Sequence, residues 1–189
     1  MKNIFLFLAI ISTTLSSIAN DSIYEINDIL INKINIYRAE KGLPELSYDS
    51  RADSSSLYHC KYIAELGIVT HYEEDTITGI PMLPEIDNRL SKFGLTKYWV
   101  MGENIAGVFD TMILSRDSLV TIVIEGWKNS NSHNMMLLNP HITKIGVNMV
   151  KGDHETYYYE DEITGDIIKH VNYINSWLFV MNVFTEKNI

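Results

Sequence analysis

Apolar residues return at helical spacing through the first two thirds of the chain. From Ile23 to Tyr37 they recur every three or four positions, and Lys41-Gly42 then supplies a basic last turn and a C-cap glycine. The same reasoning predicts three further helices, over Asp49 or Ser50 to Gly67, Asp87 to Phe93, and Ser115 to Trp127. The last helix is expected to have its N-cap at Asp117 or Ser118, and a polar turn is expected at 129–132.

The last third of the chain changes to a strand pattern. Runs rich in β-branched and aromatic residues occupy 145–150, 156–159, 167–173 and 177–184, and residues 162–166 are typical of a hairpin turn. The segment 73–84 contains Thr78-Gly79 and two prolines and is predicted to be a loop. Helices followed by an antiparallel sheet favour an α+β domain, with helices on both faces of the sheet, over a doubly wound α/β fold.

The N-terminus has the three-part pattern of a secretory signal peptide. A basic start at Lys2 precedes the apolar run Ile4 to Ile11, and a stretch of small residues ends at Ala19. The apolar run is much shorter than the about 20 residues that span a bilayer, so no transmembrane segment is expected in the mature chain. We therefore expect a signal peptide at 1–19, one domain at 20–189, and a secreted, periplasmic or extracellular location.

Composition narrows the class of partner. The formal net charge is −9, and Lys and Arg form no cluster anywhere in the chain, which disfavours nucleic acid and anionic membrane surfaces as partners. Cys60 is the only cysteine, so an internal disulfide framework is impossible and stability must come from the packed core.

Several short motifs follow one another along the chain. They are Asn35-Ile36-Tyr37-Arg38, Gly42-Leu43-Pro44-Glu45-Leu46, Gly102-Glu103-Asn104-Ile105-Ala106, Trp127 through Ser130 to His133, and Leu137-Leu138-Asn139-Pro140. In this order they resemble the CAP superfamily of cysteine-rich secretory, antigen 5 and pathogenesis-related proteins, and most closely its bacterial SCP-like branch. The resemblance covers nearly the whole mature chain. It implies an α-β-α sandwich with a central antiparallel sheet and a surface cleft where two histidines and two acids converge.

The family pattern can be carried over residue by residue. The positions that match the cleft are His71, Glu103, Glu125 and His133. Glu125 matches least well, because it precedes Trp127 by two positions whereas the acid of eukaryotic members follows the tryptophan. Asn104 and Ser130 are expected to support the cleft.

The chemistry of these side chains suits a divalent cation. Neutral imidazoles bind transition metals through one ring nitrogen, and a carboxylate either completes the shell or orients an imidazole. His71 and His133 are therefore the expected metal ligands, with zinc or another divalent cation as cofactor. The alternative is a hydrogen-bonded polar cluster that braces the sheet without a metal.

Other polar residues near these motifs have simpler explanations. His59 lies within a predicted helix beside Cys60 and is expected to be a buried, hydrogen-bonded histidine. The hydroxyls of Ser130 and Ser132 are expected to satisfy the backbone of their own turn rather than to act as nucleophiles.

Two functions follow from the cleft. The favoured one is a binding module for a small apolar or peptidic ligand, for which no catalytic residue is assigned. The alternative is a metal-dependent, peptidase-like hydrolase in which Glu103 or Glu125 acts as general base on a metal-bound water. A purely structural role remains a third interpretation.

Overall fold

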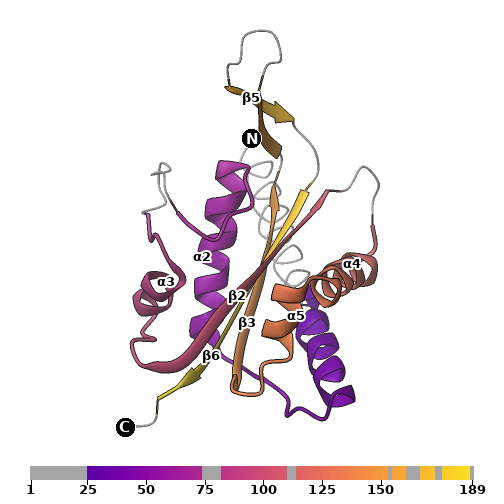
Figure 1. Cartoon of the computed structure of the whole chain (residues 1–189), viewed down its shortest axis with the longest axis vertical. Helices are drawn as coiled ribbons and strands as arrows, with labels where there is room; N and C mark the ends of the chain where they lie inside the picture. Colours follow the sequence, from indigo (N-terminus) through magenta and orange to yellow (C-terminus); the bar gives the residue numbers. More distant parts are fainter. Residues whose placement is uncertain are drawn as a thin grey trace, which may run out of the picture.

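The computed structural model describes residues 25–73, 82–109, 114–152, 155–160, 167–172 and 176–187. The expected signal peptide and the hairpin turn at 162–166 lie outside these residues. The described part forms three layers, in which α2 and α3 cover one face of the main sheet (Figure 1). The first helix (residues 25–40), α4 and α5 cover the other face.

Helix boundaries follow the capping residues. The other helices are α2 (Ser50–Leu66), α3 (Ile86–Lys92), α4 (Arg116–Asn129) and α5 (Asn131–Leu137). The α2 prediction is confirmed at both ends, because the Asp49 side chain accepts from Arg51 N at 2.9 Å and Gly67 adopts a left-handed conformation with φ of 72°.

Two predictions around α4 are wrong. Its N-cap is Ser115, whose hydroxyl accepts from Ser118 N at 3.1 Å, and not Asp117 or Ser118. The turn expected at 129–132 shrinks to Ser130, because this residue is extended and its carbonyl accepts from Asn134 N at 2.8 Å to begin α5. The polar residues that suggest a turn therefore lie inside two consecutive helices.

The main sheet has the strand order β1-β3-β6-β2. Its strands are β1 (Ser47–Tyr48), β2 (Tyr98–Phe109), β3 (Lys144–Gly152) and β6 (Ser176–Glu186). β1 and β3 are parallel, and the other pairs are antiparallel as expected. β4 (Glu155–Glu160) and β5 (Ile167–Asn172) form a separate two-stranded sheet.

The strand predictions in the last third are confirmed, but the sequence did not indicate β2. Residues 102–107 combine two glycines with Glu103 and Asn104, all of which are rare in strands. Pairing with β6 along the whole segment holds it in the sheet despite this composition. The sheet is therefore not confined to the last third of the chain.

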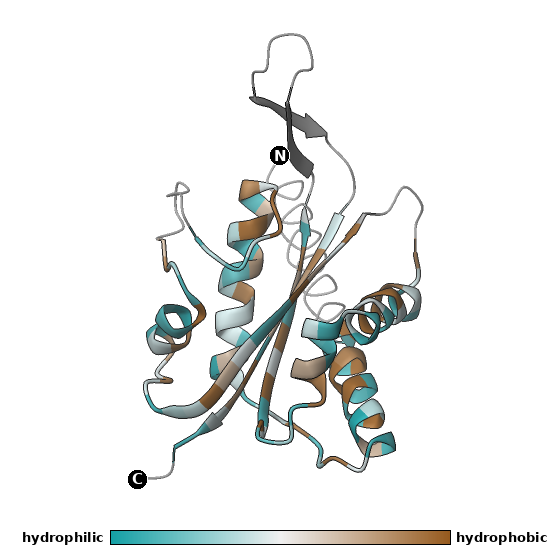
Figure 2. Ribbon diagram, viewed as in Figure 1, coloured by the Kyte–Doolittle hydropathy of each residue, from teal (hydrophilic) through white to brown (hydrophobic). Residues whose placement is uncertain are grey.

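The core lies on both faces of the main sheet because side chains on β6 alternate between the two faces. Phe179, Met181 and Val183 pack toward the first helix and α4, while Leu178 and Val180 pack against α2. Figure 2 shows hydrophobic residues along the strands of the main sheet and on the helices that cover it. In the part of the chain that the structure describes, no helix is both long and apolar enough to cross a membrane.

Close packing of α2 on β3 depends on Gly146. A Cβ at this position would overlap the main chain of Ala52 and Asp53, which cannot move without shifting α2. We expect Gly146→Ala to lower the free energy of unfolding by about 1–3 kcal/mol. The matched control is Gly126→Ala on the exposed side of α4, where a Cβ meets nothing within 4 Å and should add about 0.5–1 kcal/mol. Urea denaturation of both variants measures the difference, and equal effects would contradict the packing argument.

Candidate functional site

An ion pair between α3 and β2 lies at the centre of the site. Nη2 of Arg89 donates to both carboxylate oxygens of Glu103, at 3.0 and 2.9 Å. The two side chains are 0% and 4% exposed. Arg89 also donates to the carbonyl oxygens of Leu83 and His71, each at 3.3 Å, so that one guanidinium ties two loop ends to the sheet.

His71 connects this ion pair to the surface. Its Nδ1 lies 3.0 Å from Oε1 of Glu103, and half of its side chain is exposed. Because an ionised carboxylate only accepts hydrogen bonds, Nδ1 must carry the proton. In the neutral ring this arrangement leaves Nε2 with its lone pair, which is how a carboxylate commonly orients a metal-binding histidine.

His59 and Glu73 form a second buried pair near the pair of Arg89 and Glu103. Nδ1 of His59 lies 2.9 Å from Oε1 of Glu73, and its Nε2 lies 2.7 Å from the carbonyl oxygen of Thr70. Glu73 also accepts from Leu83 N at 2.6 Å and lies 3.7 Å from Arg89. Both ring nitrogens of His59 then face acceptors and both must donate. The expectation that His59 is buried and hydrogen-bonded is confirmed.

The buried charges in this group cancel. We call Arg89, His59, Glu73 and Glu103 the buried charge network. A guanidinium and an imidazolium balance two carboxylates, as burial of charge requires. The amide of Asn182, in the orientation that satisfies both of its polar atoms, donates to Oε2 of Glu103 at 2.9 Å. All the acceptor positions of Glu103 that face the protein are therefore used.

These contacts set the ionisation of Glu103. Burial by itself would raise the pKa of this carboxyl, but the hydrogen bond from His71 and the charges of Arg89 and His59 outweigh it and lower the pKa below its usual value. Glu103 is therefore a carboxylate at neutral pH.

His133 reaches the site from the opposite layer. The side chain of Asn104 donates to the His133 carbonyl oxygen at 3.1 Å, and the side chain of Met136 fills the space above Gly102. Burial and the nearby charge of His71 lower the pKa of His133, which keeps its imidazole neutral at pH 7. The structure thus places His71 against Glu103 and ties His133, through its carbonyl, to Asn104 on the same strand. We call His71, Glu103 and His133 the histidine site.

The histidine site supplies few direct metal ligands. The carboxylate oxygens of Glu103 accept hydrogen bonds from Arg89 and His71, so Glu103 is poorly placed to be a metal ligand and instead orients the His71 ring. Across the described residues, no group of three or more His, Cys, Asp or Glu side chains is arranged to hold an ion. Nitrogen ligands from His71 and His133 are what the arrangement offers.

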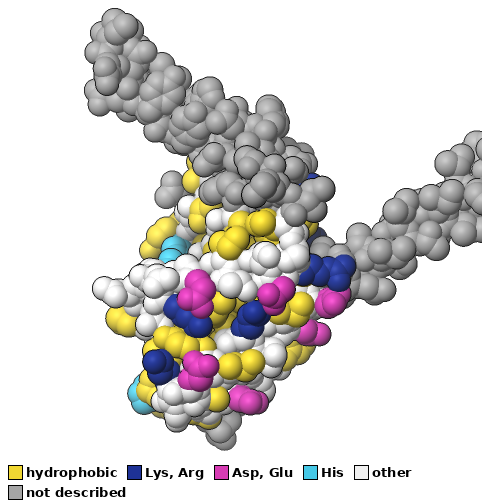
Figure 3. All heavy atoms as spheres, turned by 90° about the vertical axis from the view of Figure 1, so that its right-hand side faces the viewer, with side chains coloured by type: hydrophobic (Ala, Val, Ile, Leu, Met, Phe, Trp, Pro, Cys, Tyr) yellow, Lys and Arg dark blue, Asp and Glu magenta, His cyan; other side chains and the backbone are white. Residues whose placement is uncertain are grey.

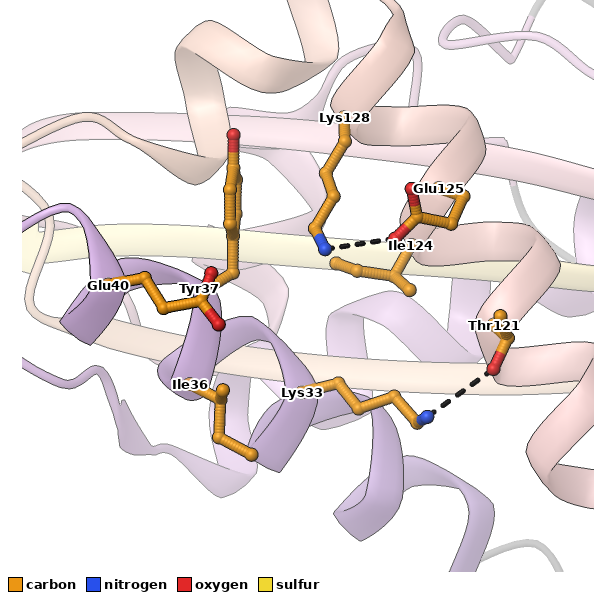
Figure 4. A pocket seen from close by; sticks show the side chains of 8 residues that line it. All are labelled: Lys33, Ile36, Tyr37, Glu40, Thr121, Ile124, Glu125 and Lys128. Atoms are coloured by element: carbon orange, nitrogen blue, oxygen red, sulfur yellow. Dashed lines mark hydrogen bonds and ion pairs between the residues drawn. The ribbon is translucent and has the colours of Figure 1, made fainter.

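The structure places Glu125 elsewhere. It lies on the outer side of α4, is 54% exposed, and pairs with Lys128 at 2.9 Å. It lines a pocket of about 250 Å³ between α4 and the first helix (Figure 4). Acidic and basic side chains are mixed across this side of the molecule (Figure 3), where Lys33 also pairs with Asp117. The helical period explains this position, because Trp127, two residues later, turns inward and is buried.

Ser130 contributes through its backbone. Its hydroxyl lies 3.4 Å from that of Ser132, and its carbonyl begins the helix that carries His133. The other polar residues of the site, Arg89, Glu73 and Asn182, were not identified from the sequence. Glu73 follows His71 by two positions, which is a weak signal, whereas Arg89 and Asn182 lie outside every recognised motif.

Comparisons with known proteins support this architecture. The family model described as "Cysteine-rich secretory protein family" (CAP) matches residues 31–164. The chain is similar to an outer surface protein from Borrelia burgdorferi, with 20% identity, a TM-score of 0.58, and coverage of 86% of this chain and 94% of that one. It is also similar to an extracellular protein containing an SCP domain from Bacillus anthracis, with 23% identity and a TM-score of 0.55. That match covers 89% of this chain and 41% of the other.

No curated protein matches the chain in sequence. At such low identity the two solved structures speak for the fold alone, and the expected α+β architecture is confirmed.

The buried charge network predicts a large effect for a neutral substitution. Glu103→Gln keeps the shape of the side chain but leaves Arg89 and His59 with one carboxylate, so the free energy of unfolding should fall by about 3–5 kcal/mol. Glu125→Gln, on the exposed side of α4, is the matched control and should change stability little. Chemical denaturation at pH 7 measures both, and a small effect at Glu103 would contradict the proposed charge balance.

The lowered pKa of His133 predicts a pH dependence with a definite sign. The folded state binds this proton less tightly than the unfolded state, in which the pKa is near 6.5. The contribution of His133 to stability is therefore greatest above pH 6.5 and decreases as the pH falls through the lower folded-state pKa. We expect wild type to lose stability relative to His133→Asn between pH 7.5 and pH 5. Denaturation of both proteins across this range measures the difference, and a parallel pH dependence would contradict it.

Proposed function

Because the chain belongs to the cysteine-rich secretory protein (CAP) family, we propose that it is a secreted ligand-binding module that uses the histidine site. The N-terminal pattern ending at Ala19 supports secretion. So do the two similar structures, one described as an outer surface protein and the other as an extracellular protein.

The proposed ligand is small and apolar, or peptidic. Exposed apolar side chains on the segments that carry His71 and Leu83 support this class, since Val69, Tyr72 and Met82 are 44%, 57% and 41% exposed. They lie on loop segments that the buried charge network holds in place, because Glu73 bonds both Leu83 N and, through its own N–H, the carbonyl of Pro84. A ligand of this class would contact these apolar side chains on the His71 side of the site.

The proposed cofactor is zinc or another divalent cation, held by His71 and His133. The Glu103 carboxylate fixes the His71 ring, and the lowered pKa of His133 keeps its nitrogen free of a proton. Catalytic zinc sites use three protein ligands, so two imidazoles alone would leave coordination positions for the ligand. A bound ion would supply a positive charge that attracts a carbonyl or carboxylate group.

One observation favours binding over metal-dependent hydrolysis. Glu103 is 4% exposed, and both of its oxygens accept hydrogen bonds from Arg89. A general base must reach a water molecule with an open lone pair, which this carboxylate does not offer. Glu125, the other candidate base, lies on the outer side of α4.

Zinc calorimetry on the mature protein tests the ion. Wild type should bind Zn²⁺, and His71→Ala or His133→Ala should each weaken binding about tenfold or more, because each removes one of two nitrogen ligands. His141→Ala, at an exposed loop histidine, is the matched control and should bind as wild type does. No heat with wild type, or heat that neither site variant reduces, would show that these histidines do not hold the ion.

A further inference from the structure

The outer edge of β2 is an uncovered strand edge beside the histidine site. β2 comes last in the strand order, so within the described sheet it pairs with β6 alone. In Figure 1 it runs across the view with no described helix or strand over it. His71 approaches this edge from the layer of α2 and α3, and His133 from the layer of α4 and α5.

Hydrogen bonds around the sheet show which main-chain groups face this edge. Nε1 of Trp127 donates to the carbonyl oxygen of Ile105 at 3.1 Å, from outside the pairing with β6. Since main-chain groups alternate along an antiparallel strand, those of Met101 and Glu103 face the same way as those of Ile105. The register agrees, because the carbonyl of Phe184, which lies opposite Met101, accepts an N–H on the β3 side at 3.2 Å.

The main chain at Glu103 is open to solvent even though its side chain is not. The side chain is 4% exposed, whereas the residue as a whole is half-buried, so its accessible surface belongs to the main chain. Within the described ranges, the outward N–H and C=O groups of Met101 and Glu103 have no hydrogen-bond partner. These groups are available to pair with another strand.

This edge has little of the usual protection against strand pairing, since its one register shift lies between Tyr98 and Val100, before Met101. Proteins commonly protect an edge with Lys, Pro or a very short strand. The opposite edge of the sheet ends in the two-residue β1, whereas β2 has 12 residues and contains no Lys, Arg or Pro. Its one charged residue, Glu103, turns into the buried charge network. A long, uncharged and accessible edge is suited to pairing with a further strand.

We propose that an extended peptide segment of a partner protein pairs with β2 as an additional strand, next to Met101 and Glu103. This inference rests on the proposed function, because it names the ligand of the same site. Side chains alternate along a strand, so those of the peptide point in turn toward the His71 side and the His133 side. The Trp127 indole already occupies the Ile105 carbonyl, so the added strand ends there and is short.

Selection from a phage library of random linear peptides on the wild-type protein tests this proposal. Enriched peptides should bind about tenfold or more weakly to Met101→Pro than to Met101→Ala, because proline removes the outward N–H and adds a ring at the edge. The ladder with β6 should survive both changes, since this N–H faces away from β6. Circular dichroism checks that each variant is folded.

Methylation of peptide nitrogens gives a second measurement that leaves the protein unchanged. N-methyl groups should weaken binding at every second position of the peptide and have little effect between them, as strand pairing requires. Protection of the Met101 and Glu103 amides from hydrogen exchange on peptide binding should accompany this. Failure to enrich any peptide, or binding that is insensitive to both Met101→Pro and N-methylation, would overturn the proposal.

The two proposals fail separately. If zinc binds but no peptide is enriched, the ion site is supported and the added strand is rejected. If peptides bind with sensitivity to N-methylation at every second position, but zinc does not bind, the added strand is supported and the ion site is rejected.

Discussion

Two buried carboxylates constrain the residues around them. Glu73 and Glu103 can remain ionised away from water only beside an equal positive charge, which Arg89 and His59 supply. Removing any one member leaves an uncompensated charge in the interior. The four residues must therefore assemble together, although they come from α2, the loop after it, α3 and β2.

The same network explains why His71 is ordered at the surface. Arg89 bonds the carbonyl of His71 while Glu103 bonds its ring, so both the backbone and the side chain of this residue are fixed. His133 is held differently, by the Asn104 contact to its carbonyl and by packing of α5 against β2. One imidazole thus depends on electrostatics in the layer of α2 and α3. The other depends on packing in the opposite layer, and β2 sets the spacing between them.

The parts of the fold that depend on local chemistry could be predicted from the sequence. The limits of α2 follow from Asp49 and Gly67, and β3 and β6 follow from runs of β-branched and aromatic residues. β2 could not be found in this way because its glycines and polar residues weaken the strand pattern, and pairing with the distant β6 determines its conformation. The family pattern brought His71, Glu103 and His133 together, but its uncertain fourth position led to Glu125.

The charged partners of Glu103 were beyond sequence reasoning for a physical reason. Arg89 belongs to a short helix whose pattern gives no sign that a guanidinium is buried there. Its position makes sense only once Glu103 is known to face the same space, 14 residues further along the chain. An ion pair between residues of different elements depends on the folded chain, so it cannot be predicted from the spacing of residues in the sequence.

Because β2 is an edge strand, residues from both helical layers can contribute to one site. Successive side chains of a strand point to opposite faces, so Glu103 turns toward α2 and α3 while Gly102 and Asn104 turn toward α5. A central strand has a neighbouring strand on each side, so a ligand cannot approach its edge. Asn182 of β6, for example, has its amide on one face, where it contacts Glu103 and the α2 residues Ser55 and Ser56. At the free edge of β2 a ligand can reach both faces at once. The position of β2 in the sheet is therefore as important to the histidine site as the identity of its residues.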